Sequence, residues 1–141
     1  MGRVIEFPER DDPVVWLMLP LAPSVNHYHN QRPNGARYLT KEGRQFRHDV
    51  WGLVKAAKGD KKYAGRLSVC LFFSFPNTSR RKRDIDNRVK PTLDALQRAG
   101  VFIDDEQVDQ LLIMRAPSAS IGSCECSVVE IPTPEEDPTA A

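Results

Sequence analysis

The sequence contains no apolar run long enough to cross a bilayer, so no membrane span and no membrane partner is predicted. Its first thirteen residues are acidic and polar, unlike a signal peptide, and the expected location is the cytoplasm. There are only three cysteines, Cys70, Cys124 and Cys126. An odd count in a reducing compartment argues against a disulfide framework, and we expect small, mostly buried side chains.

Several common functional motifs are absent as well. The chain has no glycine-rich loop that could hold phosphates and no serine or cysteine nucleophile motif. A calcium-binding EF-hand loop starting at Asp84 is excluded, because Val89 stands where glycine is needed and Ala95 where glutamate is needed.

The net charge of +1 conceals a strong asymmetry along the chain. Residues 30–90 contain 16 lysines and arginines against 5 acidic residues, whereas residues 91–141 contain 10 acidic residues against 2 basic ones. A basic middle favours binding of a polyanion such as DNA, and a well-solvated surface is the alternative. The predicted DNA-backbone contacts are the basic run Arg80, Arg81, Lys82 and Arg83, with Arg32, Arg37, Arg44 and Arg47 as weaker candidates.

The length of 141 residues predicts one domain, at residues 14–131, between a disordered extension (1–13) and a flexible acidic, proline-rich tail (132–141). Dense apolar runs predict strands at residues 14–19, 67–75, 108–114 and 124–131. Helical spacing predicts one helix from Thr40 to Gly59 and another from Asp86 or Asn87 to Gly100, which Pro91 should bend or delay. Residues 20–37 are expected to form a loop. This β-α-β-α-β-β order predicts an α+β fold with a small mixed sheet and two main helices.

Two carboxylates next to the basic run are candidate metal ligands. Asp84 and Asp86 project to the same side of an extended segment. They would supply the hard oxygen ligands of Mg²⁺, which takes further ligands from water and substrate phosphate. Asp104 or Asp105 could add a third carboxylate if the chain turns back along the helix after Gly100.

Lys90 and Asp94 lie on the same helix face as Asp86, four and eight residues further on. Lys90 would either stabilise charge at a scissile phosphate or form an ordinary helix ion pair with Asp86. Asp94 is either an acid supporting the metal ligands or a surface charge. Asp104 is a second candidate for such a supporting role.

A long motif with fixed spacing joins these residues. It runs from Arg83 through Asp84-Ile85-Asp86-Asn87-Arg88-Val89-Lys90 and Leu93-Asp94-Ala95-Leu96 to Ala99-Gly100 and Asp104-Asp105-Glu106-Gln107-Val108. Weaker matches lie upstream, at Pro23–Tyr28 and Tyr38–Gly43. The chain resembles the RusA-type Holliday junction resolvases over roughly residues 20–108. It departs from that pattern at His29 and Asn30, where family members often carry Tyr or Arg.

The resemblance implies Mg²⁺, with Mn²⁺ expected to substitute, held by Asp84, Asp86 and Asp105, and a catalytic lysine at Lys90. It makes Asn26 and Asn87 candidate DNA contacts. It also implies a homodimer that nicks two strands of a four-way junction symmetrically, because two-fold symmetry presents two equivalent sites.

The predicted function is therefore a magnesium-dependent, structure-selective DNA endonuclease of recombination and repair, of a type common in prophages. The alternatives are a less selective nuclease for branched DNA, a non-catalytic phage-type DNA-binding protein, and a phosphatase, which would need a deep pocket. Trp16 and Trp51 are predicted core or dimer contacts. Tyr28 and Tyr38 either stack on bases or anchor their loop.

Overall fold

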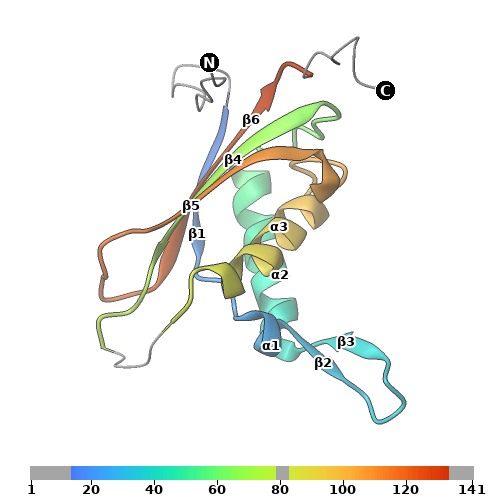
Figure 1. Cartoon of the computed structure of the whole chain (residues 1–141), viewed down its shortest axis with the longest axis vertical. Coiled ribbons are helices and arrows are strands. Elements are labelled where there is room, and N and C mark those ends of the chain that lie inside the picture. Colours follow the sequence, from blue (N-terminus) through green and yellow to red (C-terminus); the bar gives the residue numbers. More distant parts are fainter. Residues whose placement is uncertain (1–13, 79–82, 134–141) are drawn as a thin grey trace, which may run out of the picture.

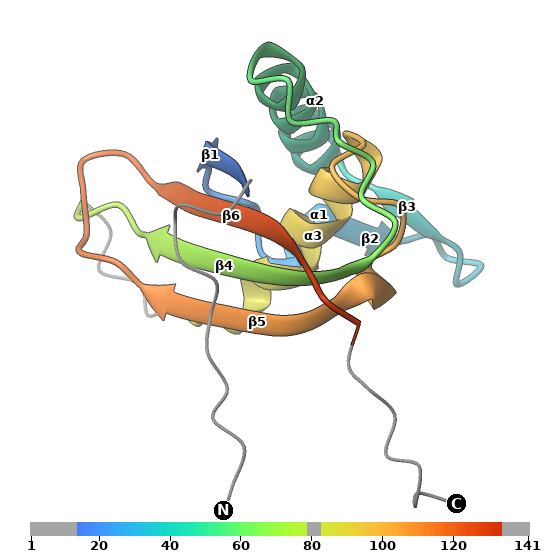
Figure 2. The same ribbon diagram turned by 90° about the horizontal axis from the view of Figure 1, so that it is seen from above.

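A four-stranded mixed sheet covered on one face by two helices forms the body of the protein (Figures 1 and 2). The computed structural model describes residues 14–78 and 83–133. The predicted extension at 1–13 and most of the predicted tail, residues 134–141, lie outside the described residues. The strands of this sheet are β1 (Val14–Pro20), β4 (Arg66–Ser74), β5 (Val108–Arg115) and β6 (Ser123–Ile131). All four predicted strands are confirmed to within a few residues.

The strand order is β1-β6-β4-β5, with β4 and β5 parallel and the other pairs antiparallel. Side chains alternate along β1. Leu17 and Leu19 are buried beneath the helices, whereas Trp16 and Met18 point to the open face and are 58% and 54% exposed. Trp51 is also 49% exposed. A place in the core is therefore wrong for both tryptophans, because each lies on the outer side of its element.

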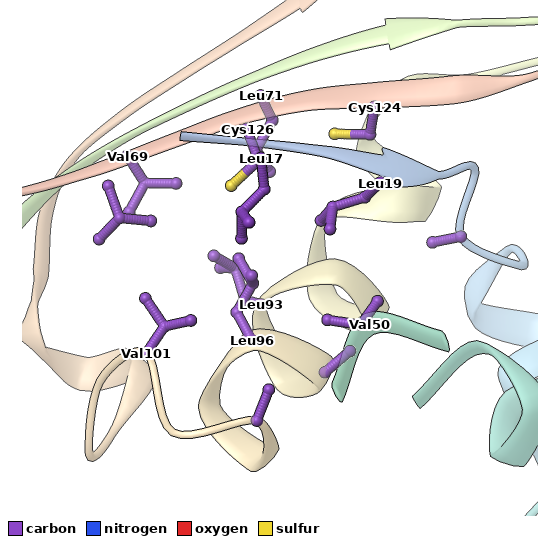
Figure 3. Packing of buried hydrophobic residues seen from close by; sticks show 14 of the residues in the cluster. Leu17, Leu19, Val50, Val69, Leu71, Leu93, Leu96, Val101, Cys124 and Cys126 are labelled. Atoms are coloured by element: carbon purple, nitrogen blue, oxygen red, sulfur yellow. The ribbon is translucent and has the colours of Figure 1, made fainter. Parts of the chain in front are cut away.

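Two helices supply the other half of the core. The first, α2 (Lys41–Ala56), begins at the predicted cap: the Thr40 side chain accepts a hydrogen bond from the Gly43 amide at 3.0 Å. The second, α3 (Val89–Arg98), packs Leu93 and Leu96 against the sheet. Figure 3 shows these leucines below Leu17, Leu71 and Cys126 of the strands. The predicted β-α-β-α-β-β order is confirmed for these main elements.

Pro91 and Gly100 set the limits of α3 as predicted. A short 3-10 turn, η1 (Asp86–Arg88), precedes the helix, so Pro91 falls in the first turn of α3. The missing amide of proline costs nothing there, because amides of the first turn have no partner within the helix. Gly100 has a φ of +89° and ends the helix. The two residues therefore fix the start and the end of α3, and with them the positions of the acidic segments before and after the helix.

The segment predicted as a loop contains regular structure, which corrects the prediction for residues 20–37. It forms α1 (Val25–Tyr28) and a projecting hairpin of β2 (His29–Gln31) and β3 (Arg37–Leu39) (Figure 1). Each element has only three or four residues, too few for a periodic apolar pattern. The turn signal was present as Asn34-Gly35: the Asn34 side chain accepts from the Ala36 amide, and Gly35 has a φ of +84°.

The remaining predictions on composition concern cysteines and membranes. Cys124 and Cys126 are buried and Cys70 is partly buried, and all three are free thiols. Burial raises the pKa of Cys124 to about 12, so its thiol stays protonated. None of the helices in the described residues is long and apolar enough to cross a membrane.

Candidate active site

Asp84 and Asp86 lie on the segment that leads into α3. Asp86 is the first residue of η1, Asp84 precedes it by two positions, and both side chains are exposed. Within the described residues, neither carboxylate has a hydrogen bond or ion pair with another side chain. Asn87, a predicted DNA contact, is exposed in the same turn. These acids therefore face solvent at the start of α3, where a ligand can reach them.

Beyond Gly100 the chain turns back along α3, which is the course that Asp105 needs in order to approach Lys90 and the acids before the helix. A second 3-10 turn, η2 (Asp105–Gln107), begins there, and the Asp104 side chain caps it by accepting from the Glu106 amide at 3.0 Å. Gln107, only 6% exposed, accepts from the amides of Ile103 and Asp104 at 3.0 and 2.7 Å. Its amide group also donates to the Tyr63 and Gly65 carbonyls, both at 2.8 Å. Gln107 thus fastens η2 to the end of the sheet.

Lys90 and Asp105 meet across this turn. The Lys90 ammonium donates a hydrogen bond to the Asp105 carboxylate, and the two groups form an ion pair. Gln97, two helical turns after Lys90 on the same face, accepts from the Asp105 amide at 3.2 Å. Lys90 is therefore not simply the i+4 partner of Asp86, because its ion pair joins α3 to η2.

The donor chemistry of the three predicted ligands fits Mg²⁺, since all are carboxylates and two are unpaired in the described structure. Among residues 14–78 and 83–133, however, no group of three or more His, Cys, Asp or Glu side chains lies close enough to hold a metal ion. Asp105 is instead held by Lys90. A magnesium site supplied largely by water and substrate phosphate needs only one or two carboxylates. The metal-ligand roles of Asp84, Asp86 and Asp105 stay predictions.

Asp94 belongs to a polar cluster that links α1, α2 and α3. Its carboxylate accepts a hydrogen bond from the Tyr28 hydroxyl and two from the Arg47 guanidinium, at 3.0 and 2.8 Å. Burial and the bond to Asp94 raise the pKa of Tyr28 to about 12. Burial alone would raise the pKa of Asp94, but the hydrogen bonds from Tyr28 and Arg47 outweigh it and leave that pKa lowered.

This cluster revises three of the predictions. Asp94 is more than a surface charge, because it ties three helices together, and its supporting role toward the metal ligands stays a prediction. Tyr28 is buried and anchors its loop, whereas Tyr38 is exposed on the hairpin. The Arg47 guanidinium donates its hydrogen bonds to Tyr28 and Asp94, which makes it a poor DNA contact.

Among the predicted DNA contacts, Asn87 lies in η1 and Arg83 lies shortly before it. Arg80, Arg81 and Lys82 lie outside the described residues. Asn26 lines an open hollow of about 410 Å³ at the base of the hairpin, with His29, Asn30, Gln31 and Arg37. Burial, followed by the charge of Arg37, lowers the pKa of His29, so this imidazole is neutral at pH 7. The hollow is lined by amide, imidazole and guanidinium groups and by Val25.

Comparison with known proteins identifies the family of this chain. The family model of endodeoxyribonuclease RusA matches residues 20–128. This chain belongs to the RusA family. It is 31% identical over 115 residues to the crossover junction endodeoxyribonuclease RusA of Shigella sonnei, which covers 82% of this chain and 93% of that protein. It is 32% identical to that of Enterobacteria phage HK97, over 81% and 92% of the two chains. The same 31% identity relates it to the RusA of Escherichia coli K12. The predicted family and enzyme class, a DNA endonuclease, are confirmed.

Several residues at the site went unrecognised in the sequence. Gln97 carries a usable signal, since it lies seven residues after Lys90 and therefore on the same helix face. Gln107 stood in the quoted motif without an assigned role. Arg88 also stood in that motif without an assigned role, whereas Phe75 and Arg115 carry no such signal, because they come from separate segments that meet only in the fold.

Proposed function

We propose that this RusA-family protein is a magnesium-dependent endonuclease that resolves four-way DNA junctions as a homodimer, by paired symmetric nicks. The observation that carries the proposal is the meeting of Lys90 and Asp105 beside α3, while Asp84 and Asp86 are exposed just before the start of that helix. The relatives named above act, by their names, on crossover junctions. Action on cellular DNA also suits the predicted cytoplasmic location.

The acidic residues and the lysine would have separate roles in cleavage. Asp84, Asp86 and Asp105 would hold the metal ion. Bound Mg²⁺ supplies a coordinated water of lowered pKa and neutralises phosphate charge. Lys90 is 70% exposed and carries three donors on a flexible stem, so it can turn from Asp105 toward the negative charge that develops on the phosphate. The ion pair with Asp105 keeps this ammonium at the site before substrate arrives.

Asp86→Asn tests the proposal directly. On a labelled four-way junction with Mg²⁺, single-turnover cleavage should fall by more than about 100-fold, because even partners outside the ligand shell cost about 10- to 100-fold when lost. Junction binding should persist, since the substitution removes a negative charge near a polyanion. The matched control is Asp49→Asn on the exposed face of α2, which should cut at the wild-type rate.

The products decide between the proposed function and its rivals. Two nicks at symmetric positions in opposing arms, and slow cutting of flaps and three-way junctions, support a junction resolvase. Equal cutting of all branched substrates would indicate a less selective nuclease. Binding without cutting in either Mg²⁺ or Mn²⁺ would indicate a non-catalytic DNA-binding protein. Undiminished cutting by Asp86→Asn would overturn the assignment of the acids.

The homodimer is testable by sedimentation of the full chain at micromolar concentration. A two-fold dimer would place two equivalent sites against two equivalent strands. Trp16, exposed on the open face of the sheet, stays a candidate contact. A monomer that nevertheless makes paired nicks would refute this part of the proposal.

A further inference from the structure

Three arginines surround one aromatic ring near the exposed acids. Phe75 follows the end of β4 and is 6% exposed. The guanidinium carbons of Arg83, Arg88 and Arg115 lie 5.8, 5.6 and 4.8 Å from the centre of its ring. The three come from the segment before η1, from η1 itself and from the end of β5. The fold therefore gathers three positive charges around one point.

Neutral groups hold these arginines in place. Arg88 donates to the Ala22 carbonyl and Arg115 to the Arg83 carbonyl, each at 2.5 Å. In the part of the chain that the structure describes, no carboxylate forms an ion pair with any of the three. Arg66 and Arg47 differ, because they pair with Asp109 and Asp94 respectively. Within residues 14–78 and 83–133 the cluster thus lacks the counter-charge that Arg47 and Arg66 have.

Three positive charges gathered around one ring favour the binding of an anion. All three guanidinium carbons lie within 5.8 Å of the same ring centre, and burial, together with the charge of Arg83, lowers the pKa of Arg88. Cation–π attraction holds each arginine to the ring but does not cancel the repulsion between them. A guanidinium has five donors in a planar fork that matches the oxygens of a phosphate. Phosphate therefore suits both the charge and the geometry of the cluster.

We propose that Arg83, Arg88 and Arg115, gathered by Phe75, bind one backbone phosphate of the DNA strand, next to the phosphate that is cut. The position of this site rests on the proposed function, because Arg83 and Arg88 directly flank the segment that carries Asp84 and Asp86. The contact is with the backbone, so it fixes the position of the strand and reads no sequence. Phe75 holds the three side chains in place, and the arginines make the contact.

Arg115→Gln tests this inference, because Arg115 is exposed at the end of β5 and its loss should leave the fold intact. Affinity for a fluorescent four-way junction is measured by anisotropy in EDTA at several salt concentrations. Loss of one phosphate contact should lower the slope of log K against log salt by about 0.9. It should also weaken binding by roughly 3- to 10-fold near physiological salt. That is the contribution to affinity expected of one phosphate contact among several. Lys61→Gln, an exposed charge lost elsewhere, should match the wild type.

A second variant separates binding from a purely structural role. Arg115→Lys keeps the charge and loses the planar fork, so it should keep the wild-type salt slope and bind with intermediate affinity. A lowered melting temperature of Arg115→Gln with unchanged salt slope and affinity would overturn the inference. So would a wild-type slope in a fully folded Arg115→Gln.

The two proposals fail in different ways. If the wild type cuts no branched DNA while Arg115→Gln still lowers the salt slope, the contact of the three arginines with a backbone phosphate stands. The resolvase proposal then fails, together with the position of that contact relative to a cut phosphate. If the wild type cuts junctions and Arg115→Gln binds with the wild-type slope, the phosphate site alone is refuted.

Discussion

Asp94→Asn is the sharpest test of how the helices of this protein are held together. In the folded chain the Asp94 carboxylate accepts from Tyr28 and from two donors of Arg47, and its side chain is 22% exposed. Substitution by asparagine keeps the shape and removes the charge. The Arg47 guanidinium, itself 25% exposed, then loses its carboxylate partner.

The expected cost follows from these contacts. A hydrogen bond to a charged group contributes about 1.5–3 kcal/mol, and asparagine can still accept one weaker bond. With partial exposure of both groups, we expect a loss of about 2 kcal/mol in the free energy of unfolding at pH 7. For a domain of this size, that corresponds to roughly 4–8 °C in the melting temperature.

The pH dependence makes this prediction specific. Because the pKa of Asp94 is lowered in the folded state, its charge contributes stability above the unfolded pKa, about 4. That contribution is lost as the pH falls through the lower, folded pKa. The stability difference between wild type and Asp94→Asn should therefore be full at pH 7 and should shrink below about pH 4.

Urea unfolding followed by circular dichroism, at pH 7 and at several values down to pH 3, measures both effects. Asp49→Asn, an exposed charge on α2, is the matched control and should change stability by less than about 0.5 kcal/mol. If Asp94→Asn is equally mild at pH 7, or if its cost does not depend on pH, the cluster does not stabilise the fold through its charge.

Two further predictions concern the site itself. Lys90→Gln should slow single-turnover cleavage by about 10²–10³-fold, if its charge acts mainly in the transition state. Junction affinity should change by less than about 10-fold, and a variant that loses affinity while cutting at the wild-type rate would contradict this role. Gln107→Leu should cost about 2–4 kcal/mol in urea unfolding, because it leaves the partly buried partners of four hydrogen bonds unsatisfied. Wild-type stability in that variant would show that η2 is held by other contacts.

The sequence predicted the main elements because each carried a strong local signal. Residues 108–114 were dense in apolar residues, Thr40 provided a helix cap, and Pro91 and Gly100 marked the ends of α3. Those same signals located the acidic motif on η1, α3 and η2, which is why Lys90 and Asp105 could be expected near one another. The hairpin of β2 and β3 was missed because strands of three residues are too short to show alternation.

Contacts between distant segments were beyond such reasoning. Tyr28, Arg47 and Asp94 form one cluster only because α1, α2 and α3 pack together, and no spacing in the chain reports that packing. The core alternative for Trp16 failed for a related reason. An apolar residue in a strand faces either the core or the open side of the sheet, and the local sequence around Trp16 is apolar on both sides. Only the register of β1 against β6 decides which face it takes.

The parallel pairing of β4 and β5 explains why acids and arginines meet in this fold. Parallel strands need a crossover connection, and here that connection carries η1, α3 and η2. The crossover begins after Phe75, at the end of β4, and finishes at η2, immediately before β5. Asp84 and Asp86 therefore lie near its beginning and Asp105 near its end, while Lys90 reaches from the first turn of α3 to η2. Because both strands run the same way, Arg115 at the end of β5 comes back beside Phe75. One topological feature thus accounts for both the Lys90–Asp105 contact and the arginine cluster.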